Sequence, residues 1–444
     1  MSALNEIITI KNDLKILLDR EGKRLKEYHV EVVNDELMIT DEDGQLFKYN
    51  PLVKESQRVQ ETLFLEKENI IENCLFGVDI NPNSVKICRL RLWIELLKNA
   101  YYKNSTELET LPNIDINIKC GNSLVSRFAI EADLRQALRK SKWTIDSYKQ
   151  AVSTYRNAEN KEQKREMEKL ISDIKSDFKT EISKNSKEVT DLIKLERDYY
   201  LKYETTHLFE ERLTKSQLKD KKQLSSKIDL LKDKIEQIKA NKIYENAFEW
   251  RFEFPEVLND EGEFIGFDVI IGNPPYKMVQ PNNTSINDLE YFRKSYPIAD
   301  FKIDLFHLFY QLGTFILKNG GDICFITPSS ILNNVYAINL RNFINKHFNI
   351  RIIAVTHNKI FDEADVHTGI FHFEKSHFPD SAKSIKLTTE LENVILKKSN
   401  FRVISQNDFK SEIGINWNLL IDSTNFSIFN KLKHLPILGN IFKN

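Results

Sequence analysis

The alternation of apolar and polar residues divides the first part of the chain into helical and extended segments. Apolar residues recur every three or four positions over residues 1–20, which predicts an amphipathic helix. Residues 27–50 alternate around polar turns, which predicts a β-hairpin that we interpret as a surface insertion. A charged helix is expected from about residue 54 to residue 72. Helices and strands are therefore mixed from the outset.

Two short apolar strands are each followed by a polar side chain. The run 74–80 reaches Asp79, after which Asn81 is placed as the N-cap of a helix. The run 114–120 alternates like a strand and precedes Asn122. Nucleotide-binding α/β folds hold their ligands at such strand ends. Taken alone, an Asp before a helix is more often a helix cap than a ligand-binding residue, and the pattern at Asn122 is nearly as typical of a turn.

The segment 127–246 contains no glycine and no proline and is rich in Lys, Glu, Asp and Gln, which predicts long helices. Two apolar seams have the spacing of a coiled coil, and each needs a partner. We expect an antiparallel helical hairpin that serves as a spacer or binds a partner. Because basic and acidic residues are interleaved along this segment, binding of nucleic acid is less expected than either of these roles. The seams are Met167, Ile171, Ile174 and Phe178, and Leu224, Ile228, Leu231, Ile235 and Ile238.

Buried strands and one apolar helix are predicted after this helical arm. Residues 277–302 are polar and irregular and mix Arg, Lys and aromatic residues, so we expect either a loop that faces DNA or an ordinary surface loop. Residues 401–444 are interpreted as a linker. The predicted strands are 267–271, 323–328, 349–356 and 367–373, and the predicted helix is 304–317.

The turn Asn273-Pro274-Pro275-Tyr276 has the most definite chemistry in the chain. Two consecutive prolines fix the backbone and remove two donors, so carbonyl groups are left free to accept hydrogen bonds. The Asn273 side-chain oxygen beside such a carbonyl suits an amino group with two hydrogens to donate. Tyr276 provides a flat face for an aromatic ring. The turn therefore predicts a site for the exocyclic amine of a nucleobase.

This turn resembles the catalytic motif of amino-group methyltransferases. Together with residues 248–257 and 266–272, it resembles the adenine-specific DNA methyltransferases of the large type IIG restriction-modification enzymes, which have a TaqI-like catalytic domain. The resemblance implies an α/β fold with the Rossmann-like sheet of class I S-adenosylmethionine-dependent methyltransferases. The expected domain combines residues 1–126 and 247–400 and is interrupted by the helical arm.

The resemblance also implies the reaction and the roles of individual residues. It implies methyl transfer from S-adenosyl-L-methionine to adenine N6 in double-stranded DNA, within a restriction-modification or phage-defence system, after the base is rotated out of the duplex. Cofactor binding is expected at Asp79, Asn122 and Phe309, and contact with the flipped base at Phe373. Amine binding is expected at Asn273 and Pro274, with Pro275 as the rigid element and Tyr276 as the stacking surface.

One departure from the family pattern affects the expected activity. None of the 13 glycines forms the GxG of a cofactor-binding loop. The chain resembles a catalytic domain truncated at both ends, so we expect weak activity alone and a separate N-terminal fragment or specificity subunit as partner. A methyltransferase acting on RNA or on protein glutamine, and a non-enzymatic subunit of a defence complex, remain open.

Composition narrows these expectations. The net charge is -1, from 64 basic and 65 acidic residues, so any DNA contact must be a local patch. The four cysteines form no CxxC and no metal site is expected. No apolar run approaches the roughly 20 residues that span a bilayer, and we expect a soluble cytoplasmic protein. No nuclease motif and no target sequence can be assigned.

Overall fold

The structure is a computed structural model in which the chain forms two compact units, Met1–Glu263 and Phe264–Asn444. It describes residues 2–104, 106–109, 111–113, 116–130, 138–158, 160–184, 186–204, 214–240, 242–299, 303–356, 367–380, 384–388, 401–406 and 417.

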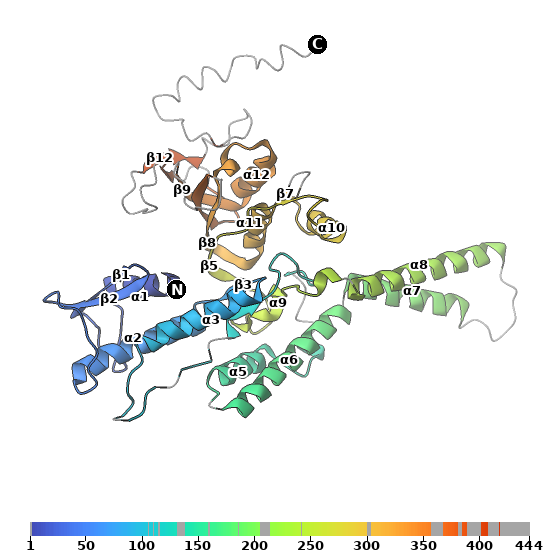
Figure 1. Ribbon diagram of the computed structural model, residues 1–444. Helices are drawn as coiled ribbons and strands as arrows, with labels where there is room; N and C mark the ends of the chain where they lie inside the picture. Colours follow the sequence, from blue (N-terminus) through green and yellow to red (C-terminus); the bar gives the residue numbers. More distant parts are fainter. Residues whose placement is uncertain are drawn as a thin grey trace, which may run out of the picture. The chain divides into compact units, whose positions relative to one another are not determined.

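The first unit begins with three helices and a hairpin that share one hydrophobic core (Figure 1). Helix α1 ends earlier than predicted, because Lys15 takes a positive φ of 57° soon after it. The predicted hairpin is present, with Asn34 and Asp35 in the left-handed region at its turn. It is not a surface insertion, since Val30 is fully buried in this core. These elements are α1 (Ser2–Asp13), β1 (Tyr28–Val33), β2 (Glu36–Asp41), α2 (Lys54–Asn73) and α3 (Pro82–Leu97).

Strands β3 (Gly77–Asp79) and β4 (Ile118–Cys120) form a parallel pair in the first unit. Their register places Asp79 opposite Cys120, and the Gly121 amide donates to the Asp79 carbonyl at 2.9 Å. Both strands therefore end at the same edge.

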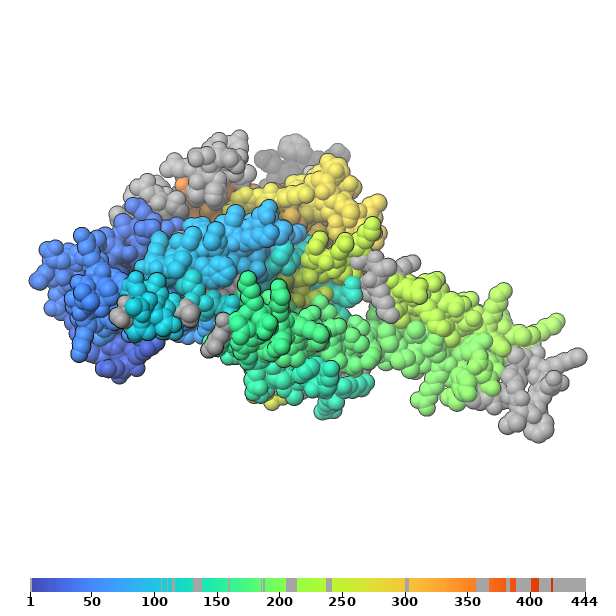
Figure 2. Space-filling view, turned by 60° about the horizontal axis from the view of Figure 1, so that its bottom comes forward, coloured from blue at the N-terminus to red at the C-terminus, as the bar shows by residue number. Residues whose placement is uncertain are grey.

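The helical arm consists of two helix pairs rather than one hairpin. Helix α5 packs against α6, and α7 packs along α8 (Figure 1). In Figure 2 the green atoms of α7 lie against the yellow-green atoms of α8. The two predicted seams therefore do not face each other. Ile174 and Phe178 of the first seam are fully buried, and Phe178 meets Tyr148 of α5 edge to face. The arm helices are α5 (Ile145–Arg156), α6 (Lys161–Lys184), α7 (Lys187–Tyr203) and α8 (Lys215–Ala240).

After the arm, short helical turns lead back into the unit. They are η2 (Lys242–Tyr244), α9 (Trp250–Glu253) and η3 (Pro255–Val257). Asn122 forms a parallel bridge with Ala247, so the two ends of the arm meet.

The second unit contains a six-stranded sheet in the order β12-β11-β9-β10-β8-β5. Strand β10 runs antiparallel to β8 and β9, whereas β5 is parallel to β8 and β11 is parallel to β9, so the sheet is mixed. Residues 402–405 form its edge strand β12, which corrects the prediction of a linker there; most of 407–444 lies outside the described residues. The strands are β5 (Phe267–Gly272), β8 (Leu317–Pro328), β9 (Phe348–Val355), β10 (Thr368–Lys375), β11 (Ser384–Thr388) and β12 (Arg402–Ser405).

Helices of the second unit cover an aromatic face of this sheet. Tyr310 of α11 contacts the rings of Phe325 and Phe373 at centroid distances of 5.1 and 5.5 Å. The remaining elements are β6 (Met278–Val279), α10 (Ile286–Ser295), β7 (Ile303–Asp304), α11 (Leu305–Ile316), η4 (Ser329–Leu332), η5 (Val335–Ala337) and α12 (Ile338–His347). Among the described helices, none has both the length and the apolarity needed to cross a bilayer.

Candidate functional site

The diproline turn begins where β5 leaves the sheet. A Cβ on Gly272 would lie 3.2 Å from the Phe325 ring, so glycine allows the strand end to pass close to β8. Asn273 is exposed and Pro274 is buried, while Pro275 is exposed again. The turn is thus anchored by one proline and presents the Asn273 amide to solvent.

Tyr276 is fixed at both ends of its ring. Its hydroxyl donates to the Ile326 carbonyl at 2.9 Å, and its ring meets Phe306 edge to face at a centroid distance of 6.5 Å. Burial raises the pKa of Tyr276 to about 12, so the phenol stays protonated at neutral pH. The ring is half-buried, which leaves part of its surface available.

The segment after Tyr276 is more ordered than predicted. Strands β6 and β7 pair through Met278 and Asp304, and the Leu305 amide donates to the Lys277 carbonyl at 3.0 Å. Helix α10 follows, with Phe292 buried on its inner face. The prediction of an irregular loop over 277–302 is therefore wrong for β6 and α10, and in α10 Leu289 and Phe292 form the buried face of a helix.

Asp304 was not among the predicted site residues. Its pairing with Met278 places it beside the diproline turn, and its Oδ1 is buried without a hydrogen-bond partner among the described residues. Burial raises the pKa of Asp304 to about 6, and the nearby amides of Phe306, Leu305 and Lys277 oppose this only in part. In the sequence, the available signal was an aspartate at the start of the apolar run 305–309.

The two predicted aromatic contacts differ in exposure. Phe309 is half-buried between the buried residues Leu308 and Tyr310 of α11, so part of its ring is accessible. Phe373 is fully buried among Tyr310, Phe348 and Trp417. The predicted contact of Phe373 with a flipped base is therefore not supported, because its strand position faces the covered side of the sheet.

In the first unit, Asp79 and Asn122 lie at the ends of the paired strands β3 and β4. The Asp79 side chain is exposed, and its Oδ1 accepts a hydrogen bond from the Asn81 amide at 2.6 Å. The Asn122 Oδ1 accepts from the Leu124 amide at 3.1 Å. Both side chains thus make local turn contacts, and the N-cap of α3 is Asn81, whose Oδ1 accepts from the Asn83 amide at 2.9 Å.

These contacts leave further hydrogen-bonding groups available. Asp79 has a second carboxylate oxygen, and Asn122 has an amide nitrogen. An exposed carboxylate beside a polar amide at the ends of parallel strands suits the hydroxyls of a ribose and the edge of a purine. The residues present therefore fit the nucleoside part of S-adenosylmethionine. Among the described residues, no group of His, Cys, Asp and Glu has the arrangement of a metal site.

Comparisons with known proteins point to one family. Residues 73–361, more than half of the chain, match the family described as Eco57I restriction-modification methylase. A putative type II restriction enzyme and methyltransferase of Methanocaldococcus jannaschii is 26% identical over 410 residues, covering 86% of this chain and 32% of the relative. The chain therefore spans about a third of that relative's length.

Two further matches are more limited. The type II restriction enzyme and methyltransferase RM.Eco57I of Escherichia coli is 28% identical over 114 residues, covering 25% of this chain and 11% of the relative. Among solved structures, the type IIG restriction endonuclease BpuSI is 12% identical, with a TM-score of 0.30, covering 91% of this chain and 55% of that chain.

Proposed function

Since this chain belongs to the Eco57I restriction-modification methylase family, we propose that it carries the catalytic residues of a DNA methyltransferase that modifies adenine N6. The methyl donor is S-adenosylmethionine, and the substrate is double-stranded DNA from which the target base is rotated outward. The protein acts within a restriction-modification or phage-defence system.

One observation carries this proposal: the turn after β5 exposes Asn273 while Pro274 and Tyr276 are held in place. Burial of Pro274 and the hydrogen bond from Tyr276 to Ile326 make the turn rigid. A rigid turn loses little conformational freedom when a base binds, so its polar groups are positioned in advance.

The chemistry assigned to the turn is activation of an amine. The Asn273 side-chain oxygen and the Pro274 carbonyl accept hydrogen bonds from the two N6 hydrogens of adenine. These contacts draw lone-pair density back onto the nitrogen and make it a better nucleophile. Tyr276 stacks on the ring of the base, and Pro275 keeps the carbonyl groups in place.

Within the first unit, Asp79 is assigned to the ribose hydroxyls of the cofactor and Asn122 to the amino edge of its adenine. The role of Phe309 against the adenine ring stays a prediction from the sequence. When bound, S-adenosylmethionine supplies a methyl group attached to a positively charged sulfur. A separate N-terminal fragment is proposed as a partner that supplies backbone donors to the methionine part of the cofactor. A specificity subunit or further segment reads the DNA sequence.

A methyl-transfer assay tests this function. The chain is incubated with methyl-labelled S-adenosylmethionine and with DNA, RNA or protein, alone and together with the N-terminal part of a longer relative. We expect label only in DNA, recovered as N6-methyladenine after digestion. Label in RNA or in protein glutamine would replace the proposal with one of the other methyltransferase activities.

Variants identify the residue that carries the reaction. Asn273→Ala should lower the rate about 100-fold or more, since it removes an acceptor used in the transition state. Asn333→Ala is the matched control, because Asn333 is also an exposed asparagine of the second unit. If Asn273→Ala retains full activity, or leaves protection against phage intact, the enzymatic proposal fails.

A further inference from the structure

Residues 246–256, called here the return segment, have no role in the proposed chemistry although they overlap the motif at 248–257. They follow the helical arm and run beside Asn122. The Asn122 amide donates to the Asn246 carbonyl at 2.7 Å, and the Phe248 amide lies within hydrogen-bonding distance of the carbonyls of Asn122 and Val125, at 3.2 and 2.9 Å. The return segment thus holds the main chain of the turn that begins at Asn122.

Glu249 holds the far end of the same turn. Its side chain is only 6% exposed. The carboxylate accepts hydrogen bonds from the Ser126 hydroxyl at 2.6 Å and from the amides of Arg127 and Phe128 at 3.1 and 3.3 Å. A buried carboxylate that satisfies several donors costs much to remove, because those donors are left without partners.

Two aromatic residues of the return segment also contact this turn. The Trp250 indole donates to the Ser123 carbonyl at 2.9 Å. A Cβ on Gly121 would lie 3.0 Å from the Phe248 ring, so the ring rests directly on the main chain of the turn. Residues 121–128 are therefore in contact with the return segment along their length.

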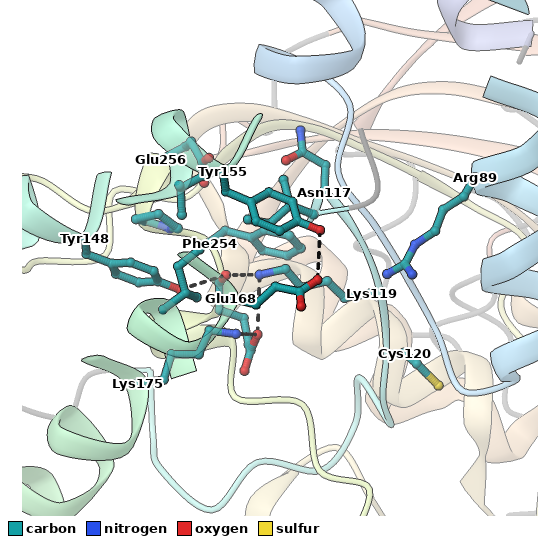
Figure 3. Close-up of a pocket in the computed structure, with 15 residues that line it drawn as sticks. Arg89, Asn117, Lys119, Cys120, Tyr148, Tyr155, Glu168, Lys175, Phe254 and Glu256 are labelled. Carbon is teal, nitrogen blue, oxygen red and sulfur yellow. Dashed lines mark hydrogen bonds and ion pairs between the residues drawn. The ribbon is translucent and has the colours of Figure 1, made fainter. Parts of the chain in front are cut away.

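The strand before the turn is held by the same segment. The ammonium group of Lys119, on β4, contacts the Glu253 carbonyl and lies 3.4 Å from its carboxylate. Lys175 of α6 binds that carboxylate at 2.5 Å. Lys119 and Lys175 border a cavity of about 360 Å³ at the root of the arm (Figure 3).

Lys119 and Glu253 affect each other's protonation, and Lys175 affects both. Burial lowers the pKa of Lys119 to about 7, with Lys175 acting in the same direction. Burial alone would raise the pKa of Glu253, but Lys119 and Lys175 hold it below its ordinary value. Glu253 is thus kept ionised between two amines and links β4 to helix α6.

We propose that the return segment is a positioning element for the cofactor site, in which Glu249 and Trp250 hold the Asn122 turn in its binding shape. This inference rests on the proposed role of Asn122 in binding the cofactor adenine. Glu249 and Trp250 are positioning residues, since they act on the cofactor only through the turn. Glu253 fixes the start of the same turn through Lys119.

Calorimetric titration of the full chain with S-adenosylmethionine and with S-adenosylhomocysteine tests this inference. Glu249→Gln preserves size but replaces an acceptor oxygen with a donor that faces other donors. We expect the dissociation constants for both ligands to rise about tenfold, as for the loss of one buried charged hydrogen bond. The KM for the cofactor should rise similarly, while kcat at saturating cofactor and the KM for DNA change less than about threefold.

Two controls separate positioning from folding. Glu245→Gln is the matched control, because Glu245 is an exposed glutamate just before the contacts described. Ser126→Ala removes one donor to Glu249 and should raise the dissociation constants by a smaller factor. This variant tests the inference if Glu249→Gln does not fold. Hydrogen exchange of the Arg127 and Phe128 amides, measured without ligand, should be faster in both Glu249→Gln and Ser126→Ala.

The outcomes are distinguishable. If the wild-type chain, with any N-terminal piece it needs, binds neither ligand, the proposed cofactor and this inference both fail. If the wild type binds and the folded Glu249→Gln and Ser126→Ala variants bind equally well, only this inference fails. A fall in kcat and a rise in the KM for DNA as large as the rise in the KM for the cofactor would also contradict this inference, since such changes point to general structural damage.

Discussion

Tyr276 is the residue whose surroundings most constrain the proposed chemistry. The hydrogen bond to Ile326 and the contact with Phe306 hold its ring in one orientation. Tyr276→Phe keeps the ring and loses the hydroxyl, so we expect activity within about threefold of wild type. Tyr276→Ala removes the stacking surface, which is worth about 1–3 kcal/mol per base, so kcat/KM for DNA should fall about 10- to 100-fold.

Steady-state kinetics with increasing DNA measures both Tyr276 variants. Equal losses of kcat/KM for DNA in Tyr276→Phe and Tyr276→Ala would show that the reaction depends on the hydroxyl and not on the ring. That result would contradict the assignment of Tyr276 as a stacking surface.

Asp304 leads to a prediction about pH. Its pKa is about 6 in the folded protein, against an ordinary value of 3.8. Between these values the folded state binds more protons than the unfolded state, so the free energy of unfolding falls as pH rises. Asp304→Asn cannot ionise and avoids this loss.

The measurement is denaturant unfolding of wild type and Asp304→Asn across this pH window. The stability of the variant relative to wild type should increase by about 2 kcal/mol from about pH 4 to about pH 7, after allowance for solvent screening, and then stay constant. A difference that does not change with pH would show that Asp304 keeps its ordinary pKa.

Single residues of the candidate site were predictable to different degrees. The exposed Asn273 follows from a polar residue at the end of an apolar strand, which is a local pattern. The burial of Phe373 does not follow from its strand, because alternation gives two faces and does not say which one a helix covers. The contacts of Asp304 depend on pairing between β6 and β7, which residue spacing does not reveal.

Among the elements, the first helix pair of the arm has the clearest core. Phe178 is fully buried and packs against Tyr148 of α5. Phe178→Ala should lower the free energy of unfolding by about 3 kcal/mol, because it leaves a cavity that the helices cannot close fully. Ile193→Ala, at a position 58% exposed on α7, should cost less than about 1 kcal/mol.

Chemical denaturation followed by circular dichroism compares these two variants. If Phe178→Ala is as stable as the Ile193→Ala control, α5 and α6 do not pack as described. If the arm unfolds separately from the rest, two transitions will appear, and Phe178→Ala will shift only one of them.

Elements were predicted best where the signal is local. The hairpin β1–β2 follows from alternation around a polar turn, and α11 from an apolar run bounded by polar residues. The predicted helix pairing in the arm was wrong. It joined the seam on α6 to the seam on α8, whereas each of these helices packs against the helix that precedes it in the sequence. The partner residues on α5 also have a 3-4-3 spacing, but this seam was not recognised; they are Ile145, Tyr148, Val152 and Tyr155.

At the level of the whole chain, the interruption of the α/β part by a helical arm was visible in the composition of residues 127–246. The mixed order of the second sheet was not, because the antiparallel placement of β10 between β8 and β9 depends on long-range pairing. The return segment was noticed as a motif, but its role required the contacts of Glu249 with Ser126 and of Glu253 with Lys119, each of which joins residues more than 100 positions apart in sequence.

The meeting of Asn122 with Asn246 and Ala247 makes the arm a removable module. A chain that leaves and rejoins a domain at neighbouring points imposes no spacing on it, so arms of other lengths, or an unrelated folded domain, can be spliced into the same junction. The first helix pair limits such grafts, because Lys175 of α6 meets Glu253 and the Tyr148 hydroxyl of α5 donates to the Phe252 carbonyl. A substitute must therefore keep α5 and α6 or supply both contacts.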